Sequence, residues 1–148
     1  MNVDKYQKMT DILSKFKSLN IVFKPPTRTN KVKFIKLPKF IKISREHTLK
    51  LIEASNIVVA NNTSVIFDAI FKNKIYISPR FIRPKNKKYD LIHENIKSCY
   101  VANSLNEFEK LIRKRQLLTN SFSTEKAKLF KKYVHNKSST IKKLKDIF

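Results

Sequence analysis

Not one of the 148 residues of this chain is glycine. Glycine-rich phosphate loops and the dinucleotide-binding fingerprint both use glycine to bring the backbone close to a phosphate, so neither motif can be built here. A tight turn with positive φ must instead use asparagine, which tolerates the left-handed region better than most other residues. Asn61, Asn62 and Asn73 stand where such turns are expected.

A unit of strand, turn, helix and strand is predicted in the middle of the chain. Residues 57–60 are a β-branched run typical of a buried strand, and the polar cluster 61–64 ends this run. Apolar residues then recur at helical spacing until Asn73, and residues 75–79 predict a second strand that ends at a proline. Such a unit is one right-handed βαβ crossover, so the sequence predicts an α/β fold with a parallel sheet.

The turn before the predicted helix is a candidate phosphate site. A helix N-terminus behind the carboxyl end of a parallel strand offers free N–H groups and a positive dipole end, where phosphate oxygens bind well. Thr63 and Ser64 would add hydroxyl donors there, and Asp68, one turn further on, could accept hydrogen bonds from a ribose or glycerol hydroxyl. A simpler alternative stays open, in which Ser64 only caps the helix and Asp68 is a solvated first-turn acid.

Basic residues from two other loops could join this site. Residues 21–23 predict a short buried strand, and the K-P-P-T-R loop that follows contains two prolines, which exclude a helix or a central strand. We expect this loop at the same sheet edge, with Lys24 and Arg28 near the same anion; ordinary solvent exposure of both is the alternative. Arg80 and Arg83 could add contacts from the polar loop predicted after the second strand, over residues 81–90.

Helices and strands are also predicted on either side of the central unit. Residues 4–18 predict one helix, and residues 44–54 predict another that opens at Ser44. Residues 99–102 predict a last strand, and Ser-Leu-Asn-Glu at 104–107 is a capping box that opens a helix. The residues expected to face the core are Met9, Ile12, Leu13 and Phe16, then Leu49, Leu51 and Ile52, and finally Phe108, Leu111 and Ile112.

The charge is strongly positive, with 33 Lys and Arg against 11 Asp and Glu, a net charge of +22. Such a balance favours nucleic acid or anionic lipid as a partner. Lysine supplies 27 of the 33 cations, however, and guanine recognition prefers arginine, so sequence-specific nucleic-acid binding is not expected. The alternation of lysine with hydrophobic residues in residues 31–44 predicts short edge strands interrupted by Pro38, and a single-strand-binding surface is the alternative.

Several kinds of segment and site are not expected in this sequence. No apolar run reaches the length of a membrane span, and the N-terminus lacks the pattern of a signal peptide. Cys99 is the only cysteine, so an internal disulfide is excluded, no metal site is expected, and a reducing compartment is indicated. Two basic amphipathic helices are predicted at residues 124–135 and 139–148. They could touch an anionic membrane surface, and a solvated helical face is the simpler alternative.

The order of these motifs resembles the C-terminal, nucleotide-binding half of GT-B-type transferases. The resemblance covers about residues 19–148 and is closest to CDP-glycerol glycerophosphotransferases and to bacterial capsule and surface-carbohydrate glycosyltransferases. Its most specific piece is N-T-S-V-I-F-D at residues 62–68, which is similar to the family's two hydroxyl residues followed by V-I-F-D or V-I-F-E. The K-P-P-T-R loop looks like the family's K-P-H-P-R loop, with Pro26 where the family has histidine.

The resemblance implies a fold and a set of binding residues. The fold is a Rossmann-like parallel sheet flanked by helices, one half of a GT-B fold, with a nucleotide-diphosphate-binding domain at residues 1–120 and C-terminal basic helices packing on it at residues 121–148. Hydroxyls and amides of the 62–64 turn would hold the diphosphate, the acid would support the ribose side, and basic residues would act as counter-charges. The nucleotide- and phosphate-binding residues implied are Lys24, Arg28, Asn62, Thr63, Ser64 and Asp68.

The resemblance also implies a reaction. A glycosyl or glycerophosphate group would pass from a CDP- or UDP-linked donor to a precursor of a bacterial capsule or teichoic-acid-like polymer. The site would be cytoplasmic or at the inner face of the membrane, with no cofactor besides the donor. Catalytic residues stay unassigned, because the family's acceptor site lies in an N-terminal half that this sequence does not contain. The chain is then expected to be a fragment, one subunit completed by a separate N-terminal partner, or a relic. A lysine-rich, non-catalytic module that binds nucleic acid or docks on membranes is the alternative.

Overall fold

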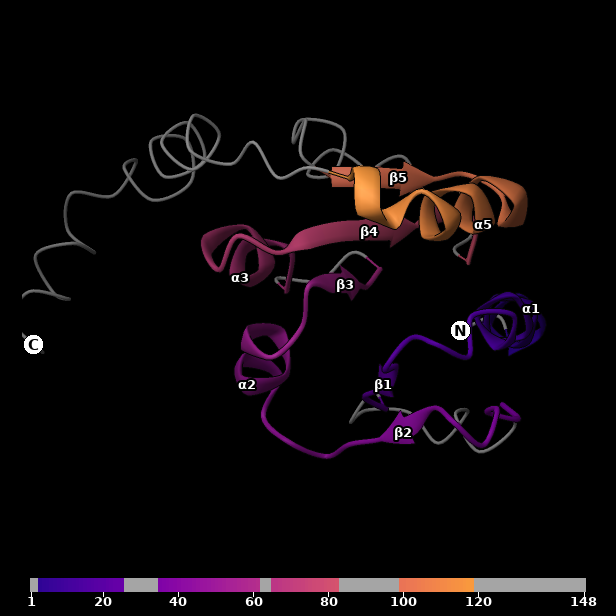
Figure 1. Ribbon diagram of the computed structural model, residues 1–148, viewed down its shortest axis with the longest axis horizontal. Coiled ribbons are helices and arrows are strands. Elements are labelled where there is room, and N and C mark those ends of the chain that lie inside the picture. Colours follow the sequence, from indigo (N-terminus) through magenta and orange to yellow (C-terminus); the bar gives the residue numbers. More distant parts are fainter. Residues whose placement is uncertain (1–2, 26–34, 62–64, 83–98, 119–148) are drawn as a thin grey trace, which may run out of the picture.

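The computed structural model describes residues 3–25, 35–61, 65–82 and 99–118 (Figure 1). These residues form a mixed α/β arrangement in which parallel strands are flanked by helices, as the sequence predicted. No described helix has the length and the apolar content needed to cross a membrane. The elements are α1 (Val3–Ser14), β1 (Val22–Phe23), β2 (Lys42–Ile43), α2 (Thr48–Glu53), β3 (Ile57–Val59), α3 (Val65–Phe71), β4 (Ile75–Pro79), η2 (Arg80–Ile82), β5 (Cys99–Ala102), α5 (Leu105–Arg113) and η4 (Arg115–Leu117).

β4 is the central strand of a three-stranded parallel sheet with the order β3-β4-β5. The register aligns Ile57 with Ile75 on one side and Pro79 with Ala102 on the other. The predicted parallel crossover through β3, α3 and β4 is therefore confirmed. Burial is deepest in β4, whereas the three residues of β3 are only partly buried, so the prediction of a buried strand at this point holds only in part.

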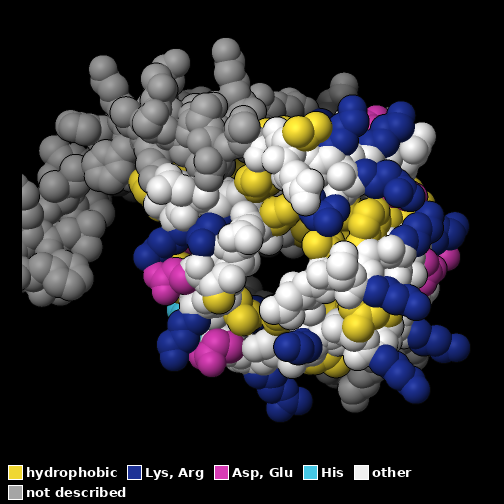
Figure 2. Space-filling view, in the orientation of Figure 1, with side chains coloured by type: hydrophobic (Ala, Val, Ile, Leu, Met, Phe, Trp, Pro, Cys, Tyr) yellow, Lys and Arg dark blue, Asp and Glu magenta, His cyan; other side chains and the backbone are white. Residues whose placement is uncertain are grey.

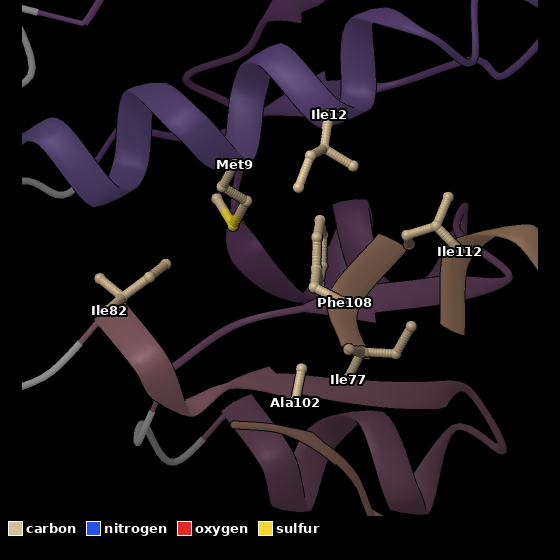
Figure 3. Close-up of a cluster of buried hydrophobic side chains, with 7 residues drawn as sticks. All are labelled: Met9, Ile12, Ile77, Ile82, Ala102, Phe108 and Ile112. Atoms are coloured by element: carbon tan, nitrogen blue, oxygen red, sulfur yellow. The ribbon is translucent and has the colours of Figure 1, made fainter. Parts of the chain in front are cut away.

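Two hydrophobic clusters form the core, and β4 contributes to both. Side chains alternate between the two faces of a strand, so Ile77 joins one cluster and Tyr76 joins the other. In the first cluster, residues of α1 and α5 point toward one another above the sheet, with Phe108 fully buried between them (Figure 3). Its buried members are Met9, Ile12, Ile77, Ile82, Ala102, Phe108 and Ile112, and those of the second are Ile66, Ala69, Ile70 and Tyr76.

The C-terminal end of α3 and the N-terminal end of α5 are formed by the residues that the sequence indicated. Asn73 follows α3 with φ 56°, the positive φ expected of an asparagine in a chain without glycine. Ser104 caps α5 and accepts a hydrogen bond from the Glu107 amide at 3.1 Å, while the Glu107 carboxylate accepts one from the Asn103 amide at 2.8 Å. The predicted capping box is confirmed, although its acidic member reaches one residue further back than usual.

The N-terminal strand does not join the central sheet. β1 pairs with β2 in a separate two-stranded parallel sheet, aligned from Val22 with Lys42 to Phe23 with Ile43. The prediction that residues 21–23 are buried was wrong, because Val22 is 44% exposed and Phe23 is only partly buried. Pro25 cannot donate to a ladder, so β1 stops after two residues and offers little surface to bury. β2 is the predicted edge strand, and both its residues are exposed.

Two other boundaries differ from the predictions. α1 ends at Ser14 rather than near residue 18. α2 begins at Thr48 and not at Ser44, because the Ser44 hydroxyl accepts a hydrogen bond from the Glu46 amide (3.1 Å) and so supports a turn instead. Leu49, expected to face the core, is 40% exposed as a result of this later start.

The polar loop predicted over residues 81–90 begins with two core residues. Ile82 is buried in η2, and the Phe81 ring lies edge-on to the Phe108 ring with 6.1 Å between centroids. Periodicity over two residues is too short to indicate this burial. The rest of that loop and the predicted helices at 124–135 and 139–148 lie outside the described residues.

Candidate functional site

The candidate site lies at the carboxyl ends of β3 and β4, and the structure describes part of it. Lys24, Asp68 and Arg80 lie within the described residues. The other predicted site residues, Arg28, Asn62, Thr63, Ser64 and Arg83, lie outside them. The site can therefore be built from the residues that enter and leave the 62–64 turn.

The chain that leaves β3 is fixed to β4 by three hydrogen bonds. The Ala60 amide donates to the Ile77 carbonyl at 3.2 Å, and the Asn61 side-chain amide donates to the Pro79 carbonyl at 3.4 Å. The Tyr76 hydroxyl donates to the Ala60 carbonyl at 2.8 Å from a fully buried ring. The backbone that enters the turn is thus held against the end of the central strand.

Tyr76 was not among the predicted site residues. The sequence does contain a signal for it, because a tyrosine in an otherwise aliphatic strand must find a partner for its hydroxyl when the ring is buried. Its partner, the Ala60 carbonyl, is the last backbone acceptor before the polar cluster 61–64. We therefore assign Tyr76 a positioning role for the turn.

Asp68 lies half-buried in the first turn of α3. Lys72, four residues further on, would be its expected ion-pair partner on a helix. The Lys72 ammonium instead pairs with Glu53 of α2 at 2.5 Å, and the Lys74 ammonium donates to the Glu53 backbone carbonyl at 2.7 Å. Within the described ranges, no side chain forms an ion pair with the Asp68 carboxylate. Its negative charge is therefore not neutralised by Lys72 or Lys74, the lysines that follow its helix.

Arg80 follows β4 directly and is partly buried in η2. The hydrogen bond from Asn61 ends on the carbonyl of the preceding residue, Pro79. Arg80 therefore comes directly after the residue to which the Asn61 side chain is bonded. Ligands of open α/β sheets bind at this carboxyl edge.

Lys24 occupies a different position from the predicted one. Its ammonium group donates to the Glu46 carbonyl at 2.5 Å, in the loop between β2 and α2. β1 pairs with β2, and β3 pairs with β4, so Lys24 and Asn61 do not share the edge of one sheet. The reason is that β1 is too short to extend the central sheet. A contact between Lys24 and an anion at the 62–64 turn stays a prediction.

Two carboxyl groups away from this edge have lowered pKa values. A hydrogen bond and the charge of Lys72 lower the pKa of Glu53, and hydrogen bonds from Arg113 and then Lys15 lower the pKa of Glu109. Glu53 thereby connects α2 to α3, and Glu109 connects α5 to the end of α1. Both acids hold helices together and lie outside the candidate site.

Metal-ligating side chains do not gather in the described part of the chain. No three His, Cys, Asp or Glu residues come together there in a way that could hold a metal ion. Cys99 is partly buried on β5 and forms no disulfide.

Comparison with known proteins returned no relative of this chain. No protein-family model, no curated protein and no solved structure matches it.

Proposed function

We propose that this chain is the donor-nucleotide-binding domain of a glycosyl- or glycerophosphotransferase that builds a bacterial capsule or teichoic-acid-like polymer. The observation that carries the proposal is the parallel β3-α3-β4 crossover, whose connecting turn is tied to the end of β4 through Ala60 and Asn61. The motif N-T-S-V-I-F-D, on which the resemblance to this family depends, follows Asn61, and its last four residues form the start of α3.

In the proposed reaction the domain stabilises the leaving nucleotide, which is a nucleoside diphosphate when a glycosyl group is transferred and a nucleoside monophosphate when a glycerophosphate group is transferred. Backbone amides and the hydroxyls of Thr63 and Ser64 would donate to its oxygens, and Lys24 and Arg28 would neutralise its charge. Asp68 would accept hydrogen bonds from the ribose, a role that suits a carboxylate with no ion-pair partner among the described residues. Arg80 is a further candidate contact because it follows the carboxyl end of β4.

The proposal includes a partner and a location. Donor binding in one domain does not position an acceptor, so an N-terminal domain or a separate subunit would supply the acceptor site and the catalytic base. The donors are cytoplasmic nucleotides, which places the reaction in the cytoplasm or at the inner face of the membrane. Beyond the donor, the mechanism uses no cofactor.

The test is nucleotide-dependent thermal stabilisation of the full chain. CDP, CDP-glycerol or a UDP-sugar at millimolar concentration should raise the melting temperature by several degrees, because a ligand that binds only the folded state stabilises it. Ser64→Ala combined with Asp68→Ala should abolish this shift. Asp4→Ala removes an exposed acid on α1 that pairs only with Lys8, so it should leave the shift intact. Melting curves that no nucleotide displaces would refute the proposal.

A second candidate function is non-specific binding of single-stranded nucleic acid, which the net charge of +22 favours. Fluorescence anisotropy with labelled oligonucleotides would test it over a series of salt concentrations. Tight binding at physiological salt, together with unchanged melting curves in the presence of nucleotides, would favour this function over the first.

A further inference from the structure

Several cations gather where α1 and α5 end. The Phe16 ring, just past the end of α1, has the guanidinium carbons of Arg113 and Arg115 at 5.5 Å and 6.0 Å from its centroid. Lys15 pairs with Glu109 at 3.1 Å in the same place. We call the set Lys15, Arg113, Lys114, Arg115 and Leu117 the basic corner.

Three of the four cations of the basic corner, Lys15, Arg113 and Arg115, are held in position before any partner binds. Arg113 donates to the Glu109 carboxylate at 2.6 Å, and Arg115 donates to the Ile112 carbonyl at 3.1 Å. Cation–π contact with Phe16 restricts both guanidinium groups further. The Glu109 carboxylate pairs with two of the four cations, Lys15 and Arg113, so the corner keeps a positive surplus. Figure 2 shows Lys and Arg side chains over much of this view of the molecule, with few acidic side chains among them.

A large hydrophobic side chain projects beside these cations. Leu117 is 77% exposed, whereas Leu118, next in the chain, packs against the first core cluster. The short helix η4 is thus anchored by one leucine and presents the other to solvent, two residues after Arg115. Leu117 has the highest exposed fraction of the exposed large hydrophobic side chains in the described ranges.

We propose that the basic corner docks the protein on a lipid bilayer that contains anionic lipids. Leu117 enters the boundary between headgroups and acyl chains, and the cations bind headgroup phosphates around it. A projecting aliphatic side chain in the same short segment as several cations matches such a surface in chemistry and charge. The inference uses residues other than those of the nucleotide site and does not depend on the proposed function.

Nucleic acid fits the basic corner less well than lipid. Single-stranded binding surfaces stack bases on exposed aromatic rings, but the aromatic ring here, Phe16, is contacted by two arginines. The exposed apolar group is a leucine, which cannot stack on a base. The structure therefore favours a bilayer over a polynucleotide as the partner.

Vesicle flotation of the full chain tests the proposal. Vesicles of phosphatidylcholine alone are compared with vesicles of phosphatidylcholine and phosphatidylglycerol in equal parts, and binding is expected only to the second. Leu117→Ser and Lys114→Glu should each lower binding about fivefold or more, and the double variant at least about tenfold. Ile43→Ser and Lys42→Glu are matched controls, because Ile43 is 63% exposed beside Lys42 on β2, outside the corner.

Each outcome of the experiment bears on the proposal. Loss of binding in the corner variants, with retention in the controls, supports it. Equal binding by all variants, equal loss in corner and control variants, or binding that ignores anionic lipid would overturn it. One further result would overturn the proposal. It is that Lys114→Glu weakens binding of an oligonucleotide while Leu117→Ser leaves vesicle binding unchanged. Nucleotide-dependent melting of the same variants should equal that of the wild type, which separates this test from that of the nucleotide site.

Discussion

The Lys74 backbone amide donates to the Ala69 carbonyl at 2.8 Å, across a turn in which Asn73 has φ 56°. The Asn73 amide donates to the Ile70 carbonyl at 3.0 Å, and the two bonds together form a Schellman motif at the end of α3. Most proteins place glycine at this position, and this chain uses asparagine. The bonds turn the backbone from α3 directly into β4.

We predict that replacing Asn73 with a β-branched residue destabilises the fold. Asn73→Val should lower the free energy of unfolding by about 1–2 kcal/mol, because valine is strained at positive φ. Asn73→Gly should be neutral or slightly stabilising, since glycine adopts this φ without a steric penalty. Urea denaturation of both variants is the measurement, and equal midpoints for valine and glycine would contradict the left-handed geometry.

Tyr76→Phe removes the hydroxyl that donates to the Ala60 carbonyl from a fully buried position. We expect a loss of about 1–2 kcal/mol in the free energy of unfolding, because the carbonyl is left without this donor. If the 62–64 turn binds diphosphate, the nucleotide-dependent melting shift should also decrease. An unchanged unfolding midpoint would argue against the positioning role of Tyr76.

Removing the N-cap hydroxyl of α5 tests the capping box. Ser104→Ala should destabilise the protein by about 1 kcal/mol, since the Glu107 amide loses its acceptor. Asn106→Ala is a suitable control, because Asn106 is an exposed residue in the same helical turn and alanine has the higher helix propensity. In thermal denaturation, Ser104→Ala should therefore lower the melting temperature, whereas Asn106→Ala should raise it or leave it unchanged.

The pH dependence of stability should change when Glu109 becomes neutral. Arg113 and Lys15 lower the pKa of Glu109 below its ordinary value of 4.5 in the folded protein. A depressed folded pKa gives stability that is present above the unfolded pKa and is lost as pH falls through the folded pKa. Glu109→Gln should thus be less stable than the wild type at about pH 7, and the difference should shrink at about pH 3. A difference that is constant with pH would contradict the ion-pair origin.

Phe108 and Leu117 provide a contrast between core and surface. Phe108→Ala should lower the free energy of unfolding by about 3–5 kcal/mol, because Phe108 is fully buried in the first cluster. Leu117→Ala should change stability by about 0.5 kcal/mol or less, since the side chain is 77% exposed. Urea denaturation checks both values. A large cost at Leu117 would mean that it has a structural role, and its use in membrane docking would then need a different variant.

The sequence predicted those parts of the fold whose causes are local. The β-branched run before residue 61, the helical spacing after it and the Ser104 to Glu107 capping box each depend on neighbours a few residues apart, and each is present in the structure. Asn73 was also predictable, because a chain without glycine has few other residues suited to a left-handed turn.

The wrong predictions concern contacts between distant segments. The apolar residues of β1 could not reveal that this strand would pair only with an exposed β2. Nor could the two-residue apolar step at Phe81 and Ile82 show that both would pack against the first core cluster. The pairing of Lys72 with Glu53 of another helix, which leaves Asp68 of the candidate site without this partner, depends on the same kind of distant contact.

Because β4 supplies Tyr76 to one cluster and Ile77 to the other, neither cluster can dissolve without disturbing the strand that the other needs. The two clusters should consequently melt in a single cooperative step. β1 and β2 share no ladder with β4, so this pair can open on its own. The Lys42 amide donates to the Ile21 carbonyl and the Ser44 amide donates to the Phe23 carbonyl. In native-state hydrogen exchange, these two amides should exchange well before the amides of β4.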